Sequence, residues 1–365
     1  MKAVIPVAKK KEDIFPFSET KPTGLMPLMG TPIVTHTIHA LQELGVEDIY
    51  LVTNYMENEF EEEFGEYTNV NIVHQEELSG TATALSCCDF IGEDFIVVNG
   101  DVIVSQDDLE NLMDKHDQVE SRVTMLATNE NKPEKFGVLS ITNDRVVSIQ
   151  EKPEEAENPL INTGIYIFSP EIFEIIEEIG STDLTDAVES LVDEDGARFE
   201  LVEDYWIDIG SPRKLWRADR IKREYDIQET DIDDSAEVHD QVEIDGKAVV
   251  EDEAVLKPGT VLEGEVYIGA GATVGPNTVV RNASIGPGSQ VEADTVGSCL
   301  VFEDTILDAA TVVEDAVLGE EVDVKPGTVI RESFIGPRSF IEMNNSIYGV
   351  QFVPDARTDL SEISK

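Results

Sequence analysis

The sequence predicts two architectures in one chain: an α/β domain with a mostly parallel sheet, followed by an all-β solenoid. Three observations support this prediction. Over about the first 230 residues, short apolar runs alternate with amphipathic helical patterns, which is typical of a sheet covered by helices on both faces. From Ile232 onward, apolar positions recur every six residues, a period typical of stacked short strands. Glycine-containing turns interrupt these strands, which excludes continuous sheet strands.

The first domain is expected to begin with four strand and helix pairs. The expected strands are residues 1–8, 48–54, 69–75 and 94–101, and the expected helices are residues 31–46 (ending near Gly45), 55–65, 80–91 and 105–118. This alternation predicts parallel strands joined by right-handed crossovers. Because ligands of such sheets bind beyond the carboxyl ends of the strands, we expect the functional residues there.

Two long runs keep the six-residue period of the second domain. The first is Ile232, Val238, Ile244, Val250, Leu256, Leu262, Ile268, Val274 and Val280, and the second is Leu300, Ile306, Val312, Leu318, Val324 and Ile330. Ile285 and Val291 lie between the runs and are one residue out of phase. Because six is even, one apolar side chain of each short strand is expected to face inward and form an internal column. The expected domains are residues 1–229 and 230–348, with a tail at 349–365.

The chain is strongly acidic, with 76 acidic and 26 basic residues and a formal net charge of -50. The acids are dispersed, which indicates folded elements with acidic outer faces. Self-repulsion at low salt therefore predicts a halophilic, cytoplasmic protein. No basic stripe suits nucleic acid and no apolar run is long enough for a membrane span, so neither partner is expected. Cys87, Cys88 and Cys299 are expected to be reduced thiols.

Eight short motifs occur in a fixed order along the chain. They are MKAVIPVA, PLMGTPIVTHTIHAL, HQEELSGTATAL, VVNGD, FGVL, IQEKP, NTGIYIF and YWIDIGSP. In this order the chain resembles the sugar-1-phosphate nucleotidyltransferase family, which includes glucose-1-phosphate thymidylyl- and uridylyltransferases, in its long form with hexapeptide repeats. The resemblance spans nearly the whole chain. It implies a Rossmann-like nucleotidyltransferase domain followed by a left-handed β-helix, a handedness that the spacing alone does not give.

The resemblance also implies a reaction, in which a nucleoside triphosphate (NTP) and a sugar-1-phosphate form a nucleoside diphosphate sugar (NDP-sugar) and diphosphate. Two highly charged phosphates must meet, so the site needs a divalent cation together with cationic or amide donors. Asp101, after the apolar run FIVV, and Asp208 are the expected Mg²⁺ ligands. The alternative is that Asp101 ends a strand and Asp208 is one of many surface acids.

The nucleotide is expected to contact Gln75, Gly80 and Thr81. The amide of Gln75 offers a donor and an acceptor side by side, which suits the edge of a pyrimidine. Gly80 leaves room for the ring, and Thr81 begins a helix. The alternative is a polar strand end followed by a glycine turn and a helix cap.

The sugar phosphate is expected to contact five residues of three motifs. Gly137 of FGVL allows a close backbone approach, Glu151 would bind hydroxyls and Lys152 would bind phosphate. Asn162 and Gly164 of the NTG motif are further expected contacts. Outside this ordered set, a Glu-Lys-Pro turn alone would indicate only a surface turn.

The opening loop departs from the family pattern. The family loop Gly-x-Gly-Thr-Arg-Leu is matched here by Lys9, Lys10, Lys11, Glu12, Asp13 and Ile14. Asp13 therefore stands at the arginine position, and Thr23 stands at the lysine position of the family's Pro-Lys-Pro-Leu. Each lost charge donor typically costs about 3 kcal/mol of transition-state stabilisation. Lys9, Lys10 and Lys11 are candidate replacement phosphate contacts; alternatively, they balance a local excess of acid.

Two functions stay open at this stage. The chain is either a sugar-1-phosphate nucleotidyltransferase with an altered triphosphate loop, or a catalytically impaired regulatory or assembly subunit that binds sugar nucleotide and partners an active paralogue. A homo-oligomer or such a hetero-oligomer is expected, because the flat solenoid faces suit isologous contacts. Acyl transfer by the solenoid is disfavoured, since it needs a general base and His239 is the only histidine after residue 230.

Overall fold

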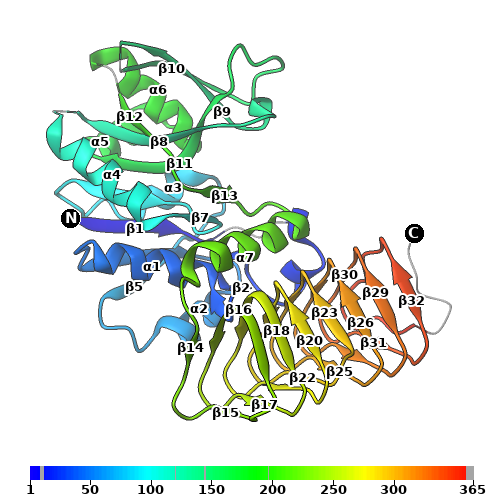
Figure 1. Ribbon diagram of the computed structural model, residues 1–365. Coiled ribbons are helices and arrows are strands. Elements are labelled where there is room, and N and C mark those ends of the chain that lie inside the picture. The colour runs from blue at the N-terminus through cyan, green and yellow to red at the C-terminus, as the bar shows by residue number, and fades with distance from the viewer. Residues whose placement is uncertain (9–11, 120, 144, 196, 359–365) are drawn as a thin grey trace. The chain divides into compact units, whose positions relative to one another are not determined.

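The computed structural model describes residues 1–8, 12–119, 121–143, 145–195 and 197–358 (Figure 1). The chain divides into two compact units. The first contains residues 1–10, 22–25 and 33–208, and the second contains residues 11–21, 26–32 and 209–365. Two short stretches near the amino terminus therefore belong to the same unit as the solenoid.

A nine-stranded sheet forms the centre of the first unit. Its main order is β10-β9-β11-β6-β1-β4-β5, and β8 pairs with both β11 and β12. The strands are β1 (Lys2–Pro6), β4 (Asp48–Thr53), β5 (Val70–His74), β6 (Phe95–Val98), β8 (Val123–Asn129), β9 (Gly137–Thr142), β10 (Arg145–Glu151), β11 (Leu160–Phe168) and β12 (Arg198–Leu201). Strands β6, β1, β4 and β5 are parallel, as predicted, whereas β11 runs antiparallel to β6, β8 and β9. The sheet is therefore mixed.

Helices follow the parallel strands as the sequence predicts. They are α1 (Ile33–Glu43), α2 (Glu57–Phe64), α3 (Thr81–Ser86), α4 (Gln106–Gln118), α5 (Ile172–Ile179) and α6 (Leu184–Asp195), with short 3-10 turns η3 (Thr23–Leu25) and η4 (Pro133–Lys135). Ser105 caps α4, because its side-chain oxygen accepts a hydrogen bond from the Asp108 amide at 3.0 Å. Successive residues of β1 point to opposite faces, so Val4 joins one apolar core and Ile5 joins the other.

The parallel strands end at one edge of the sheet. The loop after β1 begins with Val7 and Ala8, the loop after β6 contains Asn99–Asp101, and Gln75 directly follows β5. The first two loops flank the point between β1 and β6 where the strand order changes direction, which is where open α/β sheets bind ligands. A separate two-stranded pair, β7 (Val102–Val104) with β13 (Trp206–Asp208), lies beyond the end of β6 in the chain.

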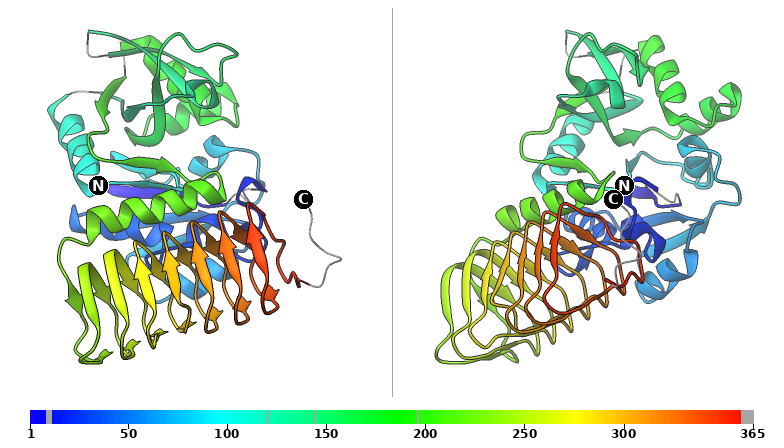
Figure 2. Two further views of the ribbon diagram at one scale, coloured as in Figure 1. Left: turned by 45° about the vertical axis from the view of Figure 1, so that its right-hand side comes forward. Right: turned by 90° about the vertical axis from the view of Figure 1, so that its right-hand side faces the viewer.

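The second unit is a left-handed β-helix built from two long parallel sheets (Figure 2). Its strands are β14 (Asp231–Ile232), β15 (Glu237–Val238), β16 (Glu243–Val250), β17 (Val255–Leu256), β18 (Val261–Ile268), β19 (Thr273–Val274), β20 (Val279–Arg281), β21 (Ser284–Ile285), β22 (Gln290–Val291), β23 (Thr295–Gly297), β24 (Leu300–Val301), β25 (Ile306–Leu307), β26 (Val312–Glu314), β27 (Val317–Leu318), β28 (Asp323–Val324), β29 (Val329–Arg331), β30 (Phe334–Ile335), β31 (Phe340–Ile341) and β32 (Ser346–Tyr348). Helix α7 (Pro212–Asp226) precedes them.

The predicted phase slip is confirmed, because Ile268 pairs with Ile285 and Val274 pairs with Val291. The prediction that Leu300, Ile306 and Val312 of the second run face inward is wrong. The inward residues there are Val301, Leu307 and Val313, which join the buried column. The physical reason is a coil one residue shorter than three six-residue sides: Leu318 pairs with Val301, 17 residues before it, so counting back in sixes from Leu318 reaches Leu300 instead.

Residues near the amino terminus pack on the solenoid within the second unit. These residues form η1 (Glu12–Ile14), η2 (Phe17–Glu19) and the hairpin of β2 (Pro27–Leu28) and β3 (Thr31–Pro32). The buried ring of Phe17 lies 5.4 Å from that of Phe302, measured between centroids, and Lys21 forms an ion pair with Glu303. Asp219 of α7 accepts a hydrogen bond from the backbone nitrogen of Met29 at 3.0 Å.

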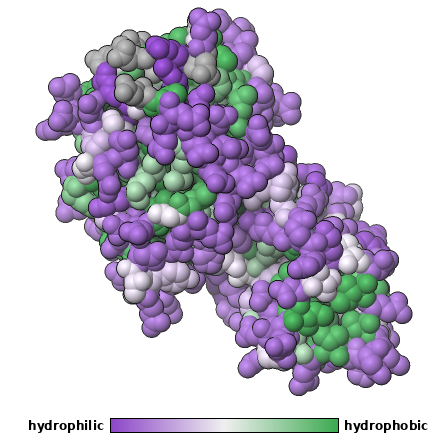
Figure 3. Space-filling view, turned by 60° about the vertical axis from the view of Figure 1, so that its left-hand side comes forward, coloured by the Kyte–Doolittle hydropathy of each residue, from purple (hydrophilic) through white to green (hydrophobic). Residues whose placement is uncertain are grey.

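Most of the molecular face drawn in Figure 3 is hydrophilic, as expected for so acidic a chain. None of the helices in the described ranges is long and apolar enough to cross a membrane.

Candidate functional site

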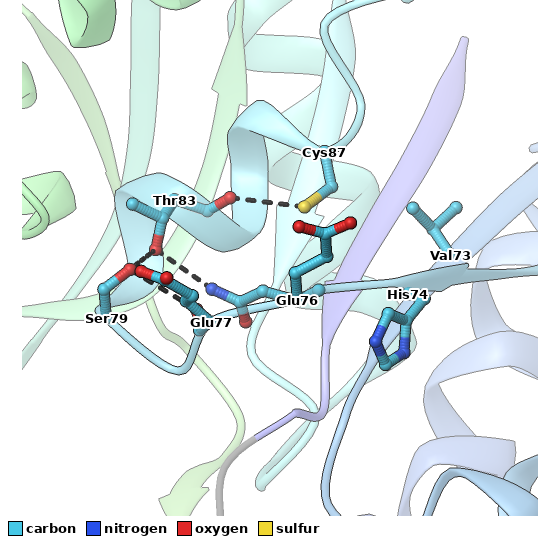
Figure 4. Close-up of a pocket in the computed structure, with 8 residues that line it drawn as sticks. Val73, His74, Glu76, Glu77, Ser79, Thr83 and Cys87 are labelled. Carbon is cyan, nitrogen blue, oxygen red and sulfur yellow. Dashed lines mark hydrogen bonds between the residues drawn. The ribbon is translucent and has the colours of Figure 1, made fainter.

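A cavity of about 500 Å³ lies at the end of β5, where the nucleotide was expected (Figure 4). It is lined by Val73, His74, Gln75, Glu76, Glu77, Ser79, Thr83 and Cys87. Both backbone groups of Gln75 are hydrogen-bonded. The backbone nitrogen donates to the Thr53 carbonyl at 2.9 Å, and the backbone oxygen accepts from Asn54 Nδ2 at 2.7 Å. The Gln75 residue is only 4% exposed, so the position of its side chain is well defined by packing.

The side-chain amide of Gln75 is already partly used inside the protein. Its Nε2 donates to Thr83 Oγ1 at 2.9 Å and to the Gly80 carbonyl at 3.4 Å. The sequence predicts that both the donor and the acceptor of this amide can bind a base. In the structure, the donor instead binds Gly80 and Thr83 at the start of α3.

Gly80 and Thr81 hold a second segment of chain, residues 182–184. Gly80 has a φ of 155°, and a Cβ added to it would lie 2.1 Å from the Thr182 carbonyl oxygen. That carbonyl accepts a hydrogen bond from the Ala82 amide at 3.0 Å, and Thr81 Oγ1 accepts one from the Leu184 amide at 3.2 Å. Glycine is therefore required here for the close approach of Thr182.

Strand pairing brings the backbones of Asp101 and Asp208 close together. Asp208, the last residue of β13, is the register partner of Val102, which follows Asp101. Both acids are half-buried. Among the described residues, no group of three or more His, Cys, Asp and Glu gathers as a metal site. Two acids at neighbouring backbone positions still suit Mg²⁺, which commonly completes its ligand set with water and substrate phosphates.

Glu151 is the centre of the expected sugar side. It pairs with Gly137 across β10 and β9, and a Cβ added to Gly137 would lie 3.2 Å from Glu151 Oε2. Lys152 Nζ lies 3.1 Å from Glu151 Oε1, and Thr185 Oγ1 donates to Glu151 Oε2 at 3.3 Å. Lys152 has a side chain that is 67% exposed, so its ammonium group is accessible to a phosphate.

Asn162 and Gly164 lie in the irregular middle of β11, beside the end of β6. The buried Asn162 amide donates to the Tyr166 hydroxyl, and its Oδ1 accepts from the Gly164 amide at 3.1 Å. Burial raises the pKa of Tyr166, so this hydroxyl stays protonated at neutral pH. A Cβ added to Gly164 would lie 2.3 Å from Asn99 Nδ2. The absence of a side chain at Gly164 therefore allows the Asn99 side chain to approach β11.

Two sets of residues in this region were not among the site residues predicted from the sequence. Asn99 belongs to the motif VVNGD, two residues before Asp101. Its nearness to Asp101 was the only sequence feature that indicated a place in the site. Residues 182–185 contact both Gly80 and Glu151. Their signal was the polar stretch around the start of α6, with Thr182 and Asp183 before the helix and Thr185 within it.

The altered loop is only partly described. Lys9, Lys10 and Lys11 lie outside the described residues. Asp13 is exposed in η1, whereas Thr23 is buried in η3 and its hydroxyl has no hydrogen-bond partner among the described residues. A buried threonine cannot reach a phosphate as a long lysine side chain does. Thr23 therefore differs from the lysine that the resemblance implies in reach as well as in charge.

Comparison with known proteins gives a consistent assignment for both parts of the chain. The nucleotidyl transferase family model matches residues 11–224, and the model of the GMPPB C-terminal domain matches residues 238–351. The bifunctional protein GlmU of Methanocaldococcus jannaschii is 32% identical over 331 residues, which cover 88% of this chain and 78% of that protein.

Two further comparisons concern the whole length and the fold. The low-salt glycan biosynthesis nucleotidyltransferase of Haloferax volcanii is 27% identical over 341 residues, which cover 89% of this chain and 94% of that protein. A solved structure of UDP-glucose pyrophosphorylase from Acinetobacter baumanii matches with a TM-score of 0.54 and 23% identity, and covers 60% of this chain and 92% of that one. At this identity the match shows a shared fold.

Proposed function

Because the chain belongs to the sugar-1-phosphate nucleotidyltransferase family, we propose that it joins an NTP to a sugar-1-phosphate and releases diphosphate. The observation that carries the proposal is the pairing of β13 with β7, which sets Asp208 beside Asp101. This acidic pair follows the end of β6, the strand that also borders Asn162 and Gly164 through β11. The proposed metal ligands and the proposed sugar-side residues thus both follow strands that pair near the end of β6, which supports the proposal.

The proposed chemistry is an attack by the phosphate oxygen of the sugar-1-phosphate on the α-phosphorus of the NTP. The new P–O bond forms as the bond to the leaving diphosphate breaks. Mg²⁺ held by Asp101 and Asp208 would supply charge neutralisation at the phosphates. Lys152 provides an exposed cation for the sugar phosphate, and Glu151, oriented by Thr185, provides acceptors for sugar hydroxyls.

Lys9, Lys10 and Lys11 are proposed as the triphosphate contacts that replace the family's glycines and arginine. Ammonium groups bind phosphate as point charges and need no fixed backbone geometry. In the sequence they come three to five residues after Pro6, the last residue of β1. The net charge of -50 and the similarity to a Haloferax protein support a high-salt cytoplasm as the working environment.

A second candidate function is favoured by one specific observation. Asp13 is exposed and Thr23 is buried at the positions where the family places arginine and lysine. A chain that has lost both donors would bind sugar nucleotide without turnover and act as a regulatory subunit of an active paralogue. The solenoid faces would then serve for assembly.

Diphosphate release by the purified chain distinguishes the two candidates. The assay is run in high potassium chloride with Mg²⁺, with UTP, dTTP and CTP against glucose-, galactose- and N-acetylglucosamine-1-phosphate. Asp101→Ala is compared with Asp114→Ala, which removes an exposed acid of α4. We expect Asp101→Ala to lose about a hundredfold or more in rate and Asp114→Ala to match the parent. If the parent releases no diphosphate with any of these substrate pairs but binds sugar nucleotide measurably, the result would favour the regulatory subunit.

A further inference from the structure

Asp108 of α4 is a fully buried acid, with 0% of its surface exposed, that holds the backbone of residues 203–204. Its Oδ1 accepts a hydrogen bond from the Glu203 amide at 2.7 Å, and its Oδ2 accepts one from the Asp204 amide at 3.3 Å. Oδ2 also accepts from the Ser105 hydroxyl at 2.6 Å. A buried carboxylate without such donors would destabilise the fold, so these three hydrogen bonds explain why an acid is tolerated here.

Residues 203–205 connect two strands of the first unit that have different partners. Before the connection, β12 pairs with β8 in the nine-stranded sheet. After it, β13 pairs with β7 and ends at Asp208, the proposed Mg²⁺ ligand. The Ser105 amide also donates to the Tyr205 carbonyl at 3.2 Å. Because β13 is only three residues long, a shift of this connection would displace Asp208.

The connection requires an acceptor on each side of the Asp108 side chain. The amides of Glu203 and Asp204 donate to different oxygens of the one carboxylate. An asparagine has a single acceptor oxygen and a nitrogen that only donates, so it would leave at least one of these buried amides without an acceptor. Asp108 also lies in the first turn of α4, where the helix dipole favours a negative charge.

We propose that Asp108 is a positioning residue for the divalent cation, because it holds the connection that keeps Asp208 in register with β7, next to Asp101. A fully buried side chain cannot itself contact a substrate. Replacement of residues that orient metal ligands commonly weakens metal binding about 10–100-fold. This inference rests on the proposed function, since it takes Asp101 and Asp208 as the ligands of Mg²⁺.

Titration of the full chain with Mn²⁺ tests the proposal without relying on turnover. Electron paramagnetic resonance measures the Mn²⁺ that stays free in high potassium chloride, and the difference between the parent and Asp101→Ala gives binding at the proposed site. Asp107→Asn is the matched control for Asp108→Asn, because Asp107 is an exposed acid of the same helix turn. We expect Asp108→Asn to bind Mn²⁺ about tenfold more weakly or worse, and Asp107→Asn to bind it like the parent.

Substitution of Ser105 separates a positioning role from a loss of stability. Ser105→Ala removes the cap of α4 and one donor to Asp108, but it leaves both amide hydrogen bonds of the connection in place. We expect this variant to melt at a lower temperature than the parent and still to bind Mn²⁺ like the parent. Diphosphate release should need about tenfold more Mg²⁺ in Asp108→Asn, with the KM for the sugar-1-phosphate unchanged.

Hydrogen exchange of the parent chain tests the same coupling without Asp108→Asn, in case that variant does not fold. If the connection positions Asp208, cation binding must in turn stabilise the connection, because coupling between two sites is reciprocal. Mg²⁺ should therefore slow amide exchange in peptides that cover residues 203–208, as measured by mass spectrometry. Asp101→Ala should abolish this effect of Mg²⁺.

Three outcomes would count against the proposal. Parent-like Mn²⁺ binding in Asp108→Asn, or amide exchange at residues 203–208 that does not respond to Mg²⁺ in a parent that releases diphosphate, would overturn this inference alone. Equal losses of Mn²⁺ affinity in Asp108→Asn and Ser105→Ala would overturn the positioning role, because any destabilisation of α4 would then weaken the site. A parent that neither binds Mn²⁺ at this site nor releases diphosphate would overturn the inference together with the proposed function.

Discussion

Substitution of Gly80 by alanine tests the contact between the turn before α3 and residues 182–184. The added Cβ would lie 2.1 Å from the Thr182 carbonyl oxygen, far inside van der Waals contact. The backbone oxygen cannot move alone, because it accepts from the Ala82 amide and belongs to the segment held by Thr81. Gly80→Ala must therefore displace residues 182–184 or unwind the start of α3.

The expected loss of stability follows from two contributions. A non-glycine residue at this φ of 155° costs about 1–3 kcal/mol. Displacement of residues 182–184 also loses the hydrogen bonds of the Ala82 and Leu184 amides, at about 1 kcal/mol each. We therefore expect the variant to lose about 3–5 kcal/mol in free energy of unfolding.

Urea denaturation in high potassium chloride measures this loss, and Gly92→Ala is the matched control. Gly92 lies on the surface of the same unit and has no atom within 4 Å of an added Cβ. We expect the control to unfold like the parent. The reasoning is refuted if Gly80→Ala is as stable as Gly92→Ala, because the close approach of Thr182 would then carry no constraint.

Three further predictions concern other parts of the structure. Asp219→Asn should lose about 3 kcal/mol or more of unfolding free energy, because it leaves the guanidinium of Arg223, only 2% exposed, without an anion; a urea titration that shows a loss below about 1 kcal/mol would contradict this. His74 holds the pKa of the Glu57 carboxyl below its usual 4.5, so the ionised carboxylate stabilises the fold above that pH and the contribution is lost as the pH falls through the lowered pKa. Glu57→Gln should therefore be less stable than the parent at pH 7, by less than about 1 kcal/mol, and equal to it in acid, as thermal melts over pH 3–7 would show; a constant difference across that range would speak against the pair. Thr185→Val should raise the KM for the sugar-1-phosphate roughly three- to tenfold and leave the KM for the NTP unchanged, whereas equal increases in both would indicate general unfolding of the site.

The sequence was sufficient to predict both folds because each has its own period. The internal register of the solenoid was harder to predict where apolar residues stand in pairs. Leu300 and Val301 are adjacent, as are Ile306 and Leu307 and then Val312 and Val313. A shift of one residue therefore keeps an apolar side chain at every sixth position, and only strand pairing decides which member of each pair faces inward.

The positions of the candidate site residues followed from motif order, but the roles of their side chains did not. Gln75 was expected to offer both ends of its amide, yet Thr83 takes the donor. Gly80 was expected to make room for a base ring, yet the nearest group to its missing side chain is the carbonyl of Thr182. These contacts join residues that are separate in sequence, and a motif carries no information about them.

The solenoid contacts of the amino-terminal segment were also beyond the motifs. Phe17 ends the short apolar run Ile14-Phe15-Pro16-Phe17, and nothing in the sequence predicts that its ring packs against Phe302. The contact forms because burial of an aromatic ring stabilises the fold most when the ring packs against another apolar surface.

Detection of the NDP-sugar product by mass spectrometry tests the central claim most directly. The parent chain is compared with a variant in which Lys9, Lys10 and Lys11 are all replaced by glutamine, with the substrate panel and high salt described above. We predict that the parent makes the product and that the triple variant makes at least about a hundredfold less of it. A parent that makes no product with any substrate pair would contradict nucleotidyl transfer by this chain, and a fully active triple variant would contradict the lysine loop as its triphosphate site.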